Sequence, residues 1–311
     1  MSILGKFFRT RVAAPAPELV ELARHIGDIG HRLDNMDRIA VLQLNMRCAR
    51  ELRELLADPR YAARGRLERH GRKVWSQCDE DGILEEIFHR IGAVSRSFVE
   101  FGVSHGRECN TLKLLVEGWR GLWMESDADN CDRMRRVFAA HLADGRLELQ
   151  QTSVGTDNIN ALLAASSVVA AGELDLLSID IDGNDYHVLK AVEMRPRVLV
   201  IEYNGKYPPP MDLVPDYDPT HRWDNSDYAG SSLQALANLA ARRGYRLVGT
   251  NIAGVNAFFV RSDLAGDRFA DEDVAALYNP ARYWLTPGYA AGHPPGGRFG
   301  YTSDEKLKGT R

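Results

Sequence analysis

Two short stretches of the sequence carry oxygen-bearing side chains that could bind a divalent cation or accept a proton. Asp180 and Asp182 follow one nearly all-apolar run, and Glu202 and Asn204 follow the next. Carboxylate and amide oxygens on neighbouring strand ends suit a hard cation such as Mg²⁺, which would lower the pKa of a bound hydroxyl. Without a metal, Asp182 or nearby His187 would be the general base. Residues 182–185 (DGND) would also suit a turn followed by a helix N-cap, so a purely structural interpretation stays open.

A glycine-containing turn follows an earlier apolar run. Residues 98–111 read FVEFGVSHGRECNT, in which Glu100, Gly102 and Gly106 have the spacing E-x-G-x-x-x-G. A strand that enters such a turn and then a helix presents backbone N–H groups to a ligand. The spacing differs from the dinucleotide fingerprint G-x-G-x-x-G, which disfavours nicotinamide and flavin cofactors. Glu125 ends the next apolar run, about 20 residues on, where a carboxylate could accept ribose hydroxyls, so we predict a nucleoside ligand.

Three features in this order resemble a known enzyme family. Residues 98–125 resemble motif I and the acidic second-strand end of class I S-adenosylmethionine (SAM) dependent methyltransferases. Residues 76–82 (SQCDEDG) and 178–183 (SIDIDG) resemble the FkbM-type members of that class. The resemblance covers the chain from Trp75 to Leu264. It implies a Rossmann-like α/β fold, with a mostly parallel seven-stranded sheet, an antiparallel last strand and SAM as cofactor.

The resemblance also implies roles for individual residues. The residues predicted to bind SAM are Gln77, Glu100, Gly102, Ser104, Gly106, Asn110, Glu125, Ser126, Ser153, Val154 and Asp180. The predicted catalytic residues are Asp182, His187 and Asn204, which are chosen from their position after the two strands and not from the resemblance. The hypothetical Mg²⁺ ligands are Asp180, Asp182, Glu202 and Asn204, because some sugar and catechol O-methyltransferases look similar at these two strand ends.

The predicted activity is O-methylation of a hydroxyl on a sugar, glycan or secondary-metabolite acceptor, a choice that comes from the resemblance. The alternatives are an N-methyltransferase and a catalytically inactive subunit that uses the same fold for binding or assembly. A long loop rich in proline and aromatic residues, 205–228, follows the fifth predicted strand and is placed to shape an acceptor pocket. Its Tyr207, Trp223 and Tyr228 could stack on sugar rings or simply fold the loop on itself.

Apolar runs alternate with amphipathic stretches, which predicts a parallel sheet covered by helices on both faces. The predicted strands are 98–101, 121–125, 147–151, 174–181 and 198–203, followed by a closing hairpin of 245–250 and 257–260. A helix over 83–91 precedes them, with Asp79 or Asp81 as its cap. This position would let Gln77 reach the cofactor, although 76–81 also fits a plain capping sequence.

The chain is predicted to comprise a helical arm (1–57), a basic linker (58–73), the methyltransferase domain (74–265) and a C-terminal extension with a loose tail (266–311). In the arm, Leu19, Leu22, Ile26, Ile29, Leu33 and Met36 alternate at intervals of three and four. This is the seam of a coiled coil or helical hairpin, so the arm would form a homo-oligomer or lie on its own domain. Gly27 and Gly30 weaken the helix, and the seam slips beyond Met36, which predicts a stutter or break.

The linker carries Arg60, Arg64, Arg66, Arg69, Arg72 and Lys73. These residues could hold a diphosphate or an anionic glycan, or they could simply be solvated.

Composition and charge indicate which partners and which cellular environment suit the protein. The formal net charge of -4 and a pI of about 6.2 disfavour nucleic acid as a partner. The four cysteines contain no C-x-x-C pair, which is consistent with reduced thiols and a cytoplasmic protein. We expect no transmembrane segment, because no apolar run approaches the length of a membrane span. Residues 1–11 mix apolar and basic side chains, which suits a frayed terminus better than shallow membrane contact.

Overall fold

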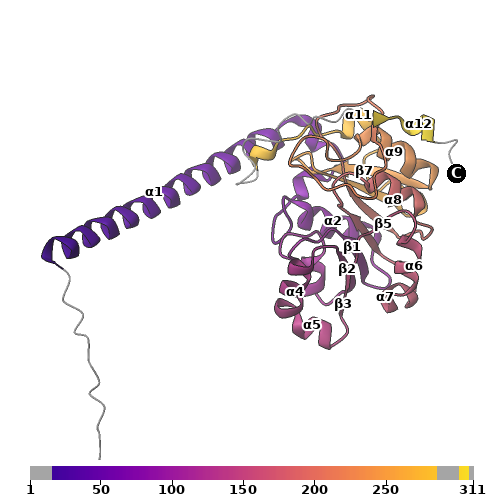
Figure 1. The fold of residues 1–311 in the computed structure, drawn as a ribbon. Coiled ribbons are helices and arrows are strands. Elements are labelled where there is room, and N and C mark those ends of the chain that lie inside the picture. The colour runs from indigo at the N-terminus through magenta and orange to yellow at the C-terminus, as the bar shows by residue number, and fades with distance from the viewer. Residues whose placement is uncertain (1–15, 286–300, 308–311) are drawn as a thin grey trace, which may run out of the picture. The chain divides into compact units, whose positions relative to one another are not determined.

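A computed structural model describes residues 16–285 and 301–307, and it divides the chain after Arg50 into two compact units. The first unit consists of most of helix α1 (Pro17–Leu56), which confirms the predicted arm helix (Figure 1). A break beyond Met36, one of the two predicted outcomes, is wrong, because α1 continues unbroken to Leu56 and also runs through Gly27 and Gly30. Each glycine costs about 1 kcal/mol relative to alanine, which weakens a long helix without ending it.

The second unit is built on a seven-stranded sheet. Its strands are β1 (Ser97–Phe101), β2 (Arg120–Glu125), β3 (Leu147–Gln151), β4 (Leu176–Ile179), β5 (Val198–Glu202), β7 (Tyr245–Thr250) and β8 (Asn256–Arg261). Their order across the sheet is β3-β2-β1-β4-β5-β8-β7. The first five strands pair in parallel, whereas β8 is antiparallel to both of its neighbours. The predicted Rossmann-like class I methyltransferase fold is therefore confirmed.

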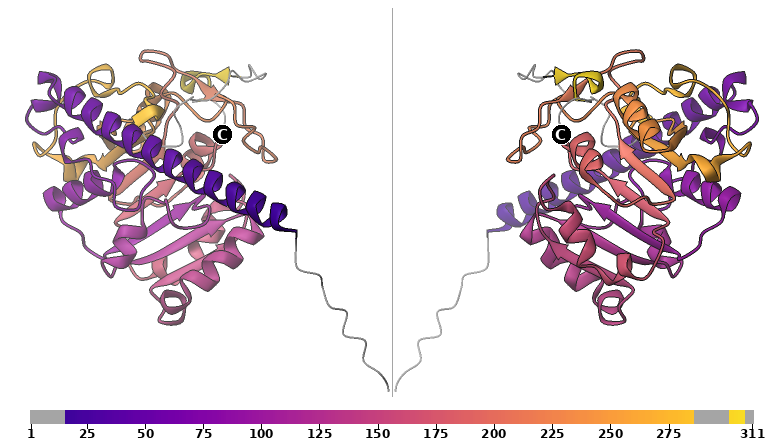
Figure 2. Two further views of the ribbon diagram at one scale, coloured as in Figure 1. Left: turned by 90° about the vertical axis from the view of Figure 1, so that its left-hand side faces the viewer. Right: turned by 90° about the vertical axis from the view of Figure 1, so that its right-hand side faces the viewer.

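Helices cover both faces of this sheet, as Figure 2 shows. Side chains alternate along each strand, so Phe98 of β1 packs in one hydrophobic cluster while Val99 and Phe101 pack in the other. Helices α2 (Glu80–Ile91), α3 (Leu112–Val116) and α4 (Ala128–Val137) complete the first cluster. Helices α6 (Ile159–Ala164), α8 (Asp185–Ala191) and α9 (Leu233–Arg242) complete the second. The sheet therefore lies between two cores, with the carboxyl ends of its parallel strands at one edge.

The remaining elements are short. They are η1 (Pro59–Ala62), η2 (Glu68–His70), α5 (Ala139–Ala143), α7 (Ser167–Ala170), β6 (Val214–Pro215), α10 (Ser262–Ala265), α11 (Val274–Leu277), η3 (Tyr283–Leu285), β9 (Tyr301–Thr302) and α12 (Asp304–Leu307). None of the helices in the described part of the chain is long and apolar enough to cross a membrane.

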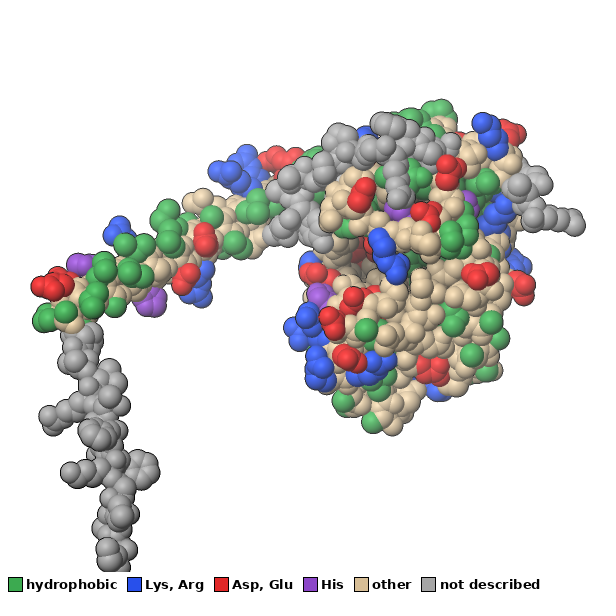
Figure 3. Space-filling model, in the orientation of Figure 1, with side chains coloured by type: hydrophobic (Ala, Val, Ile, Leu, Met, Phe, Trp, Pro, Cys, Tyr) green, Lys and Arg blue, Asp and Glu red, His purple; other side chains and the backbone are tan. Residues whose placement is uncertain are grey.

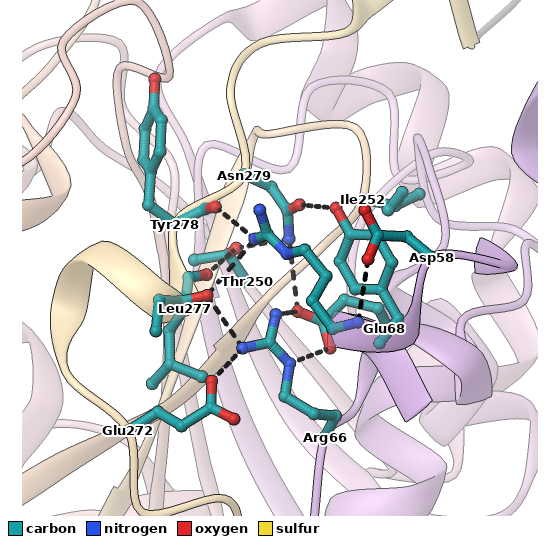
Figure 4. Close-up of polar contacts among 12 residues, drawn as sticks. Asp58, Arg66, Glu68, Thr250, Ile252, Glu272, Leu277, Tyr278 and Asn279 are labelled. Atoms are coloured by element: carbon teal, nitrogen blue, oxygen red, sulfur yellow. Dashed lines mark hydrogen bonds and ion pairs between the residues drawn. The ribbon is translucent and has the colours of Figure 1, made fainter. Parts of the chain in front are cut away.

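The basic segment after α1 is part of the second unit's core. Arg66 is only 3% exposed, and its guanidinium donates to both oxygens of buried Glu68 at 2.6 and 3.1 Å (Figure 4). The third guanidinium nitrogen, Nη1, donates to the carbonyl of Ala276 at 2.9 Å. Asn279 donates to Thr250 Oγ1, and Tyr61 donates to the Asn279 side chain. Both expectations for the linker, solvated or ligand-holding, are wrong for Arg66, which ties this segment to the C-terminal extension.

Part of the C-terminal extension also packs on the second unit. Asp304 of α12 is fully buried, where it accepts from the Tyr186 hydroxyl and pairs with Arg242. Strand β9 pairs with β6 in a separate two-stranded sheet. The prediction that the C-terminal extension ends in a loose tail is therefore wrong for residues 301–307. Residues 286–300 and 308–311, and the N-terminal segment 1–11, lie outside the described residues.

Candidate active site

Gly102 brings two strand ends into close contact. It follows β1 with a φ of 72°, and a Cβ at this position would lie 1.7 Å from the Asp180 carbonyl oxygen. Only glycine accommodates both the positive φ and this approach. Ser104 also has a positive φ, of 50°, and its N–H donates to Glu125 Oε2 at 2.8 Å. The turn therefore runs close to the ends of β2 and β4.

Glu100 holds the far side of the same turn. Its Oε1 accepts from the Asn110 N–H at 2.8 Å, and its Oε2 accepts from the Thr111 N–H at 3.1 Å. The hydroxyls of Thr111 and Ser178 donate to it as well. Burial raises the pKa of this carboxyl, whereas the hydrogen bonds oppose the rise. Glu100 thus fixes the start of α3 in addition to lining a cavity.

Two adjoining cavities open at this edge of the sheet. The wider one measures about 880 Å³ and the narrower one about 270 Å³. Gly102, Ser104, Asp180, Asp182 and Trp223 line both. Because one set of side chains forms a wall of each, a ligand in the narrow cavity would lie beside a ligand in the wide one.

All but one of the residues predicted to bind SAM line these cavities. Three of them, Gly102, Ser104 and Asp180, belong to the shared wall. The narrow cavity is also lined by Glu125, Ser126, Ser153 and Val154. The wide cavity is also lined by Gln77, Glu100 and Asn110. The exception is Gly106, whose absent Cβ would meet Met134, Phe138 and Trp123 at 3.0 Å. Gly106 therefore serves packing, and the expectation that it faces the cofactor is not met.

Glu125 lies at the end of β2 with 8% of its surface exposed. Its two oxygens accept from the backbone N–H groups of Ser104 and Asp127, each at 2.8 Å. These bonds hold the carboxylate in the wall of the narrow cavity, and each oxygen retains a second lone pair for a ligand hydroxyl.

Asp180, Asp182 and Glu202 form a carboxylate group at the ends of β4 and β5. One oxygen from each lies within 4.8 Å of the others, an arrangement that could hold a metal ion. Burial raises the pKa values of Asp180 and Glu202 well above their usual range, and neighbouring carboxylates add to the rise. Burial, followed by the charge of Asp185, raises the pKa of Asp182 to about 6. Such a group is stabilised by a cation or by protons.

The backbone around Asp182 is held in an unusual turn. Strand β4 ends at Ile179, two residues earlier than predicted, and Asp182 has a φ of 55°. The Asp185 carboxylate accepts from the N–H groups of Ile181 and Gly183, each at 2.9 Å. The turn-forming interpretation of 182–185 is therefore correct for Asp185, and this turn presents Asp182 to both cavities.

Two predicted catalytic residues are placed differently. His187 lies on α8, where its Nε2 is 2.8 Å from the Pro215 carbonyl, and it lines neither cavity. The role of general base is therefore wrong for His187. Asn204 lines the wide cavity, but its amide donates to the Asp227 carbonyl at 2.7 Å and accepts from the Lys206 N–H at 3.1 Å. These bonds hold the following loop.

Sequence reasoning missed part of the wide cavity's wall. Tyr278, Tyr283 and Trp284 of the C-terminal extension line it, although they follow the domain boundary predicted at 265. Of the three loop aromatics for which both acceptor stacking and loop packing stayed open, Tyr207 and Tyr228 line neither cavity, whereas Trp223 lines both. The clustered aromatics of 278–284 (YNPARYW) were the one signal available in the sequence.

The cap of α2 also differs from expectation. Asp79 occupies the N-cap position without a side-chain capping bond. Asp81 Oδ2 instead accepts from the N–H groups of residues 74, 75 and 76 at 2.7–2.8 Å, which holds the segment before Gln77.

Comparisons with known proteins give a distant likeness of structure. No protein-family model matches the chain, and no curated protein matches its sequence. The N-terminal domain of EvdMO1 with SAH bound is 14% identical, with a TM-score of 0.36 over 58% of this chain and 79% of that one. The glycopeptide N-methyltransferase MtfA complexed with SAH is 16% identical, with a TM-score of 0.36 over 63% and 95% of the two chains.

A third structure, magnesium protoporphyrin IX methyltransferase (ChlM) from Synechocystis with bound SAH, is 11% identical, with a TM-score of 0.34 over 53% and 74%. At these identities and TM-scores, neither an activity nor a substrate of these proteins can be assigned to this chain. The case for a function therefore rests on the sheet order and the paired cavities.

Proposed function

We propose that this protein is a SAM-dependent methyltransferase that acts on a hydroxyl of a sugar, glycan or secondary metabolite. One observation carries the proposal: a narrow polar cavity and a wide, partly aromatic cavity share a wall at the carboxyl edge of a methyltransferase-type sheet. Ligands of such sheets bind outside the carboxyl ends of the strands.

The residues present fit the cofactor. The backbone cradle at Gly102 would be filled by a Cβ, and the Glu125 carboxylate is held in the wall of the narrow cavity. Glu125 would accept the ribose hydroxyls, Ser153 and Val154 would contact the base, and Gln77 and Asn110 would face the amino-acid end. When bound, SAM supplies a methyl group on a sulfonium. The chain's contribution is to align an acceptor with it and to manage the acceptor's proton.

The wide cavity suits a polar, ring-shaped acceptor. Trp223, Tyr278, Tyr283 and Trp284 offer aromatic surface, while Glu108 and Asp227 offer carboxylates in the same wall. Aromatic faces combined with a few polar groups are typical of sites that hold one orientation of a small molecule.

The carboxylate group of Asp180, Asp182 and Glu202 would handle the acceptor's proton in one of two modes. With Mg²⁺ bound, these oxygens would hold the metal, which would lower the pKa of the acceptor hydroxyl. In the metal-free mode, Asp182 would accept the proton, and its raised pKa of about 6 suits a general base near neutral pH. Because His187 lies outside both cavities, Asp182 is the residue that takes part in both modes.

The test is transfer of a labelled methyl group from SAM to a panel of hydroxylated acceptors. We expect label on hydroxyls, and we expect Asp182→Asn to lower the rate about 10²- to 10⁴-fold while retaining SAH binding. Asp216→Asn is the matched control, because Asp216 is exposed and lines neither cavity. Loss of activity on chelation, restored by Mg²⁺, would select the metal mode.

The alternatives give different results in the same assay. Label found only on amines would replace the proposal with N-methylation. SAH binding without transfer to any acceptor would favour the inactive binding subunit.

A further inference from the structure

Helix α1 carries a continuous apolar seam on its surface. The six side chains of the seam, defined by alternating intervals of three and four residues, are between 54% and 65% exposed: Leu19, Leu22, Ile26, Ile29, Leu33 and Met36. Figure 3 shows apolar side chains gathered along this helix. A spacing that averages 3.5 residues is the pattern by which two helices supercoil around each other.

A single helix of this kind is poorly stabilised in water. Most helical stability in proteins comes from packing of an apolar face, and α1 contains two glycines within the length of the seam. Full burial of an aliphatic side chain removes roughly 100 Å² from water, so the twelve side chains of two paired seams would remove roughly 1,200 Å² in total. This area reaches the lower bound of specific protein interfaces, about 1,200 Å².

The charges beside the seam favour a second copy of α1 as the partner that packs against it. In a parallel pair, a residue at heptad position g faces position e, five residues further along the other helix. With Leu19, Ile26 and Leu33 at position a, Arg32 falls at g and Asp37 at e. Arg32 of one chain would therefore face Asp37 of the partner subunit, with opposite charge.

The same positions argue against other arrangements. In an antiparallel pair with its layers in register, Arg32 would face His25 of the partner subunit, which provides no attraction. A membrane surface is also disfavoured, because α1 contains seven acidic residues and six arginines, whereas helices that bind anionic lipids have a basic polar face.

We propose that two copies of this chain associate in parallel through the α1 seam from Leu19 to Met36. In the unshifted heptad the next positions are Ala40, Gln43 and Arg47, so the seam of the proposal ends at Met36. Beyond it the exposed apolar side chains follow a shifted pattern of Ile39, Leu42 and Met46. This association is independent of the proposed activity, since every residue that carries it lies in α1.

The test is the molar mass of the full chain in solution, by light scattering or sedimentation equilibrium at micromolar concentration. We expect twice the chain mass of 34.7 kDa. Ile26→Asp with Ile29→Asp should reduce the mass to that of one chain. Val20→Asp is the matched control, because Val20 is an equally exposed apolar residue outside the seam, and its mass should remain that of a pair.

The orientation has its own test. Arg32→Asp should weaken the pair by placing two acids together, and adding Asp37→Arg should restore it. Thermal unfolding of each variant reports whether the second unit stays folded. A single-chain mass for the native protein, or a paired mass that survives the double seam substitution, would overturn the proposal. Failure of the charge exchange to restore pairing would overturn the parallel register.

Discussion

Glu100 and Glu125 lie on neighbouring parallel strands, and their surroundings assign them different tasks. Glu100 receives hydrogen bonds from the start of α3, so it organises the glycine turn. Glu125 receives them from Ser104 and Asp127 and stays in the wall of the narrow cavity. The sequence predicted both carboxylates as site residues. It could not separate their roles, because those depend on the path of loops between the strands.

His187 illustrates the opposite case, in which residue type alone misled. A histidine shortly after two aspartates is a natural candidate base, but its direction depends on where α8 begins. The helix starts at Asp185 and turns the imidazole toward Pro215, and burial there lowers the pKa of His187. A shift of the helix start by one residue turns a side chain by about 100°, which exceeds the accuracy of a boundary predicted from sequence.

Asp79 provides a prediction about pH. Burial, followed by the charge of Glu80, raises the pKa of Asp79 from 3.8 to about 7, and its Oδ1 accepts no hydrogen bond within the described residues. The folded state therefore holds a proton that the unfolded state releases near pH 4, so Asp79 costs the protein stability as the pH rises from about 4 to about 7.

Asp79→Asn removes this cost. We expect its free energy of unfolding, relative to the native protein, to increase by about 1–3 kcal/mol across that pH range and to level off above it. Urea unfolding at several pH values measures this, with exposed Asp129→Asn as the control. A difference that does not vary with pH would show that Asp79 ionises normally.

Among the elements, the C-terminal extension departs most from the prediction, because part of it lines the candidate site. Hydrogen bonds of Arg66 and Glu68 connect residues 58–70 to residues 272–279 (Figure 4). Tyr278, Tyr283 and Trp284, which belong to or follow this connected segment, line the wide cavity. Arg66 and Glu272 are separated by 206 residues in sequence. No local pattern encodes a contact of that separation, so a boundary drawn where the strand and helix alternation ends left this segment out.

Trp284 tests whether the extension contacts the acceptor. Its side chain lines the wide cavity and is 47% exposed, so substitution should leave the fold intact. We expect Trp284→Ala to raise the KM for the acceptor about fivefold while SAH affinity stays unchanged, because stacking contributes about 1 kcal/mol beyond burial. Trp75→Ala is the control, since Trp75 is 37% exposed and lines neither cavity. Equal effects of the two substitutions would remove the extension from the acceptor site.

At the scale of the whole molecule, the sheet could be predicted and the cavities only in part. Alternating strands and helices with right-handed crossovers leave few topologies, and the closing hairpin placed the antiparallel strand correctly. The site residues at strand ends followed from that topology, because the carboxyl ends of parallel strands meet at one edge. Residues from the extension and the exact length of β4 required the three-dimensional contacts.

In the proposed function, the narrow cavity binds the nucleoside of SAM through Glu125. Calorimetric titration of SAH into the native protein, into Glu125→Gln and into the exposed control Asp129→Asn tests this assignment. We expect saturable binding at one site per chain, unchanged in the control. We expect binding at least about tenfold weaker in Glu125→Gln, because a charge-assisted pair with the ribose hydroxyls is lost. No binding to the native protein, or equal affinity in Glu125→Gln with its fold intact, would overturn the assignment of Glu125.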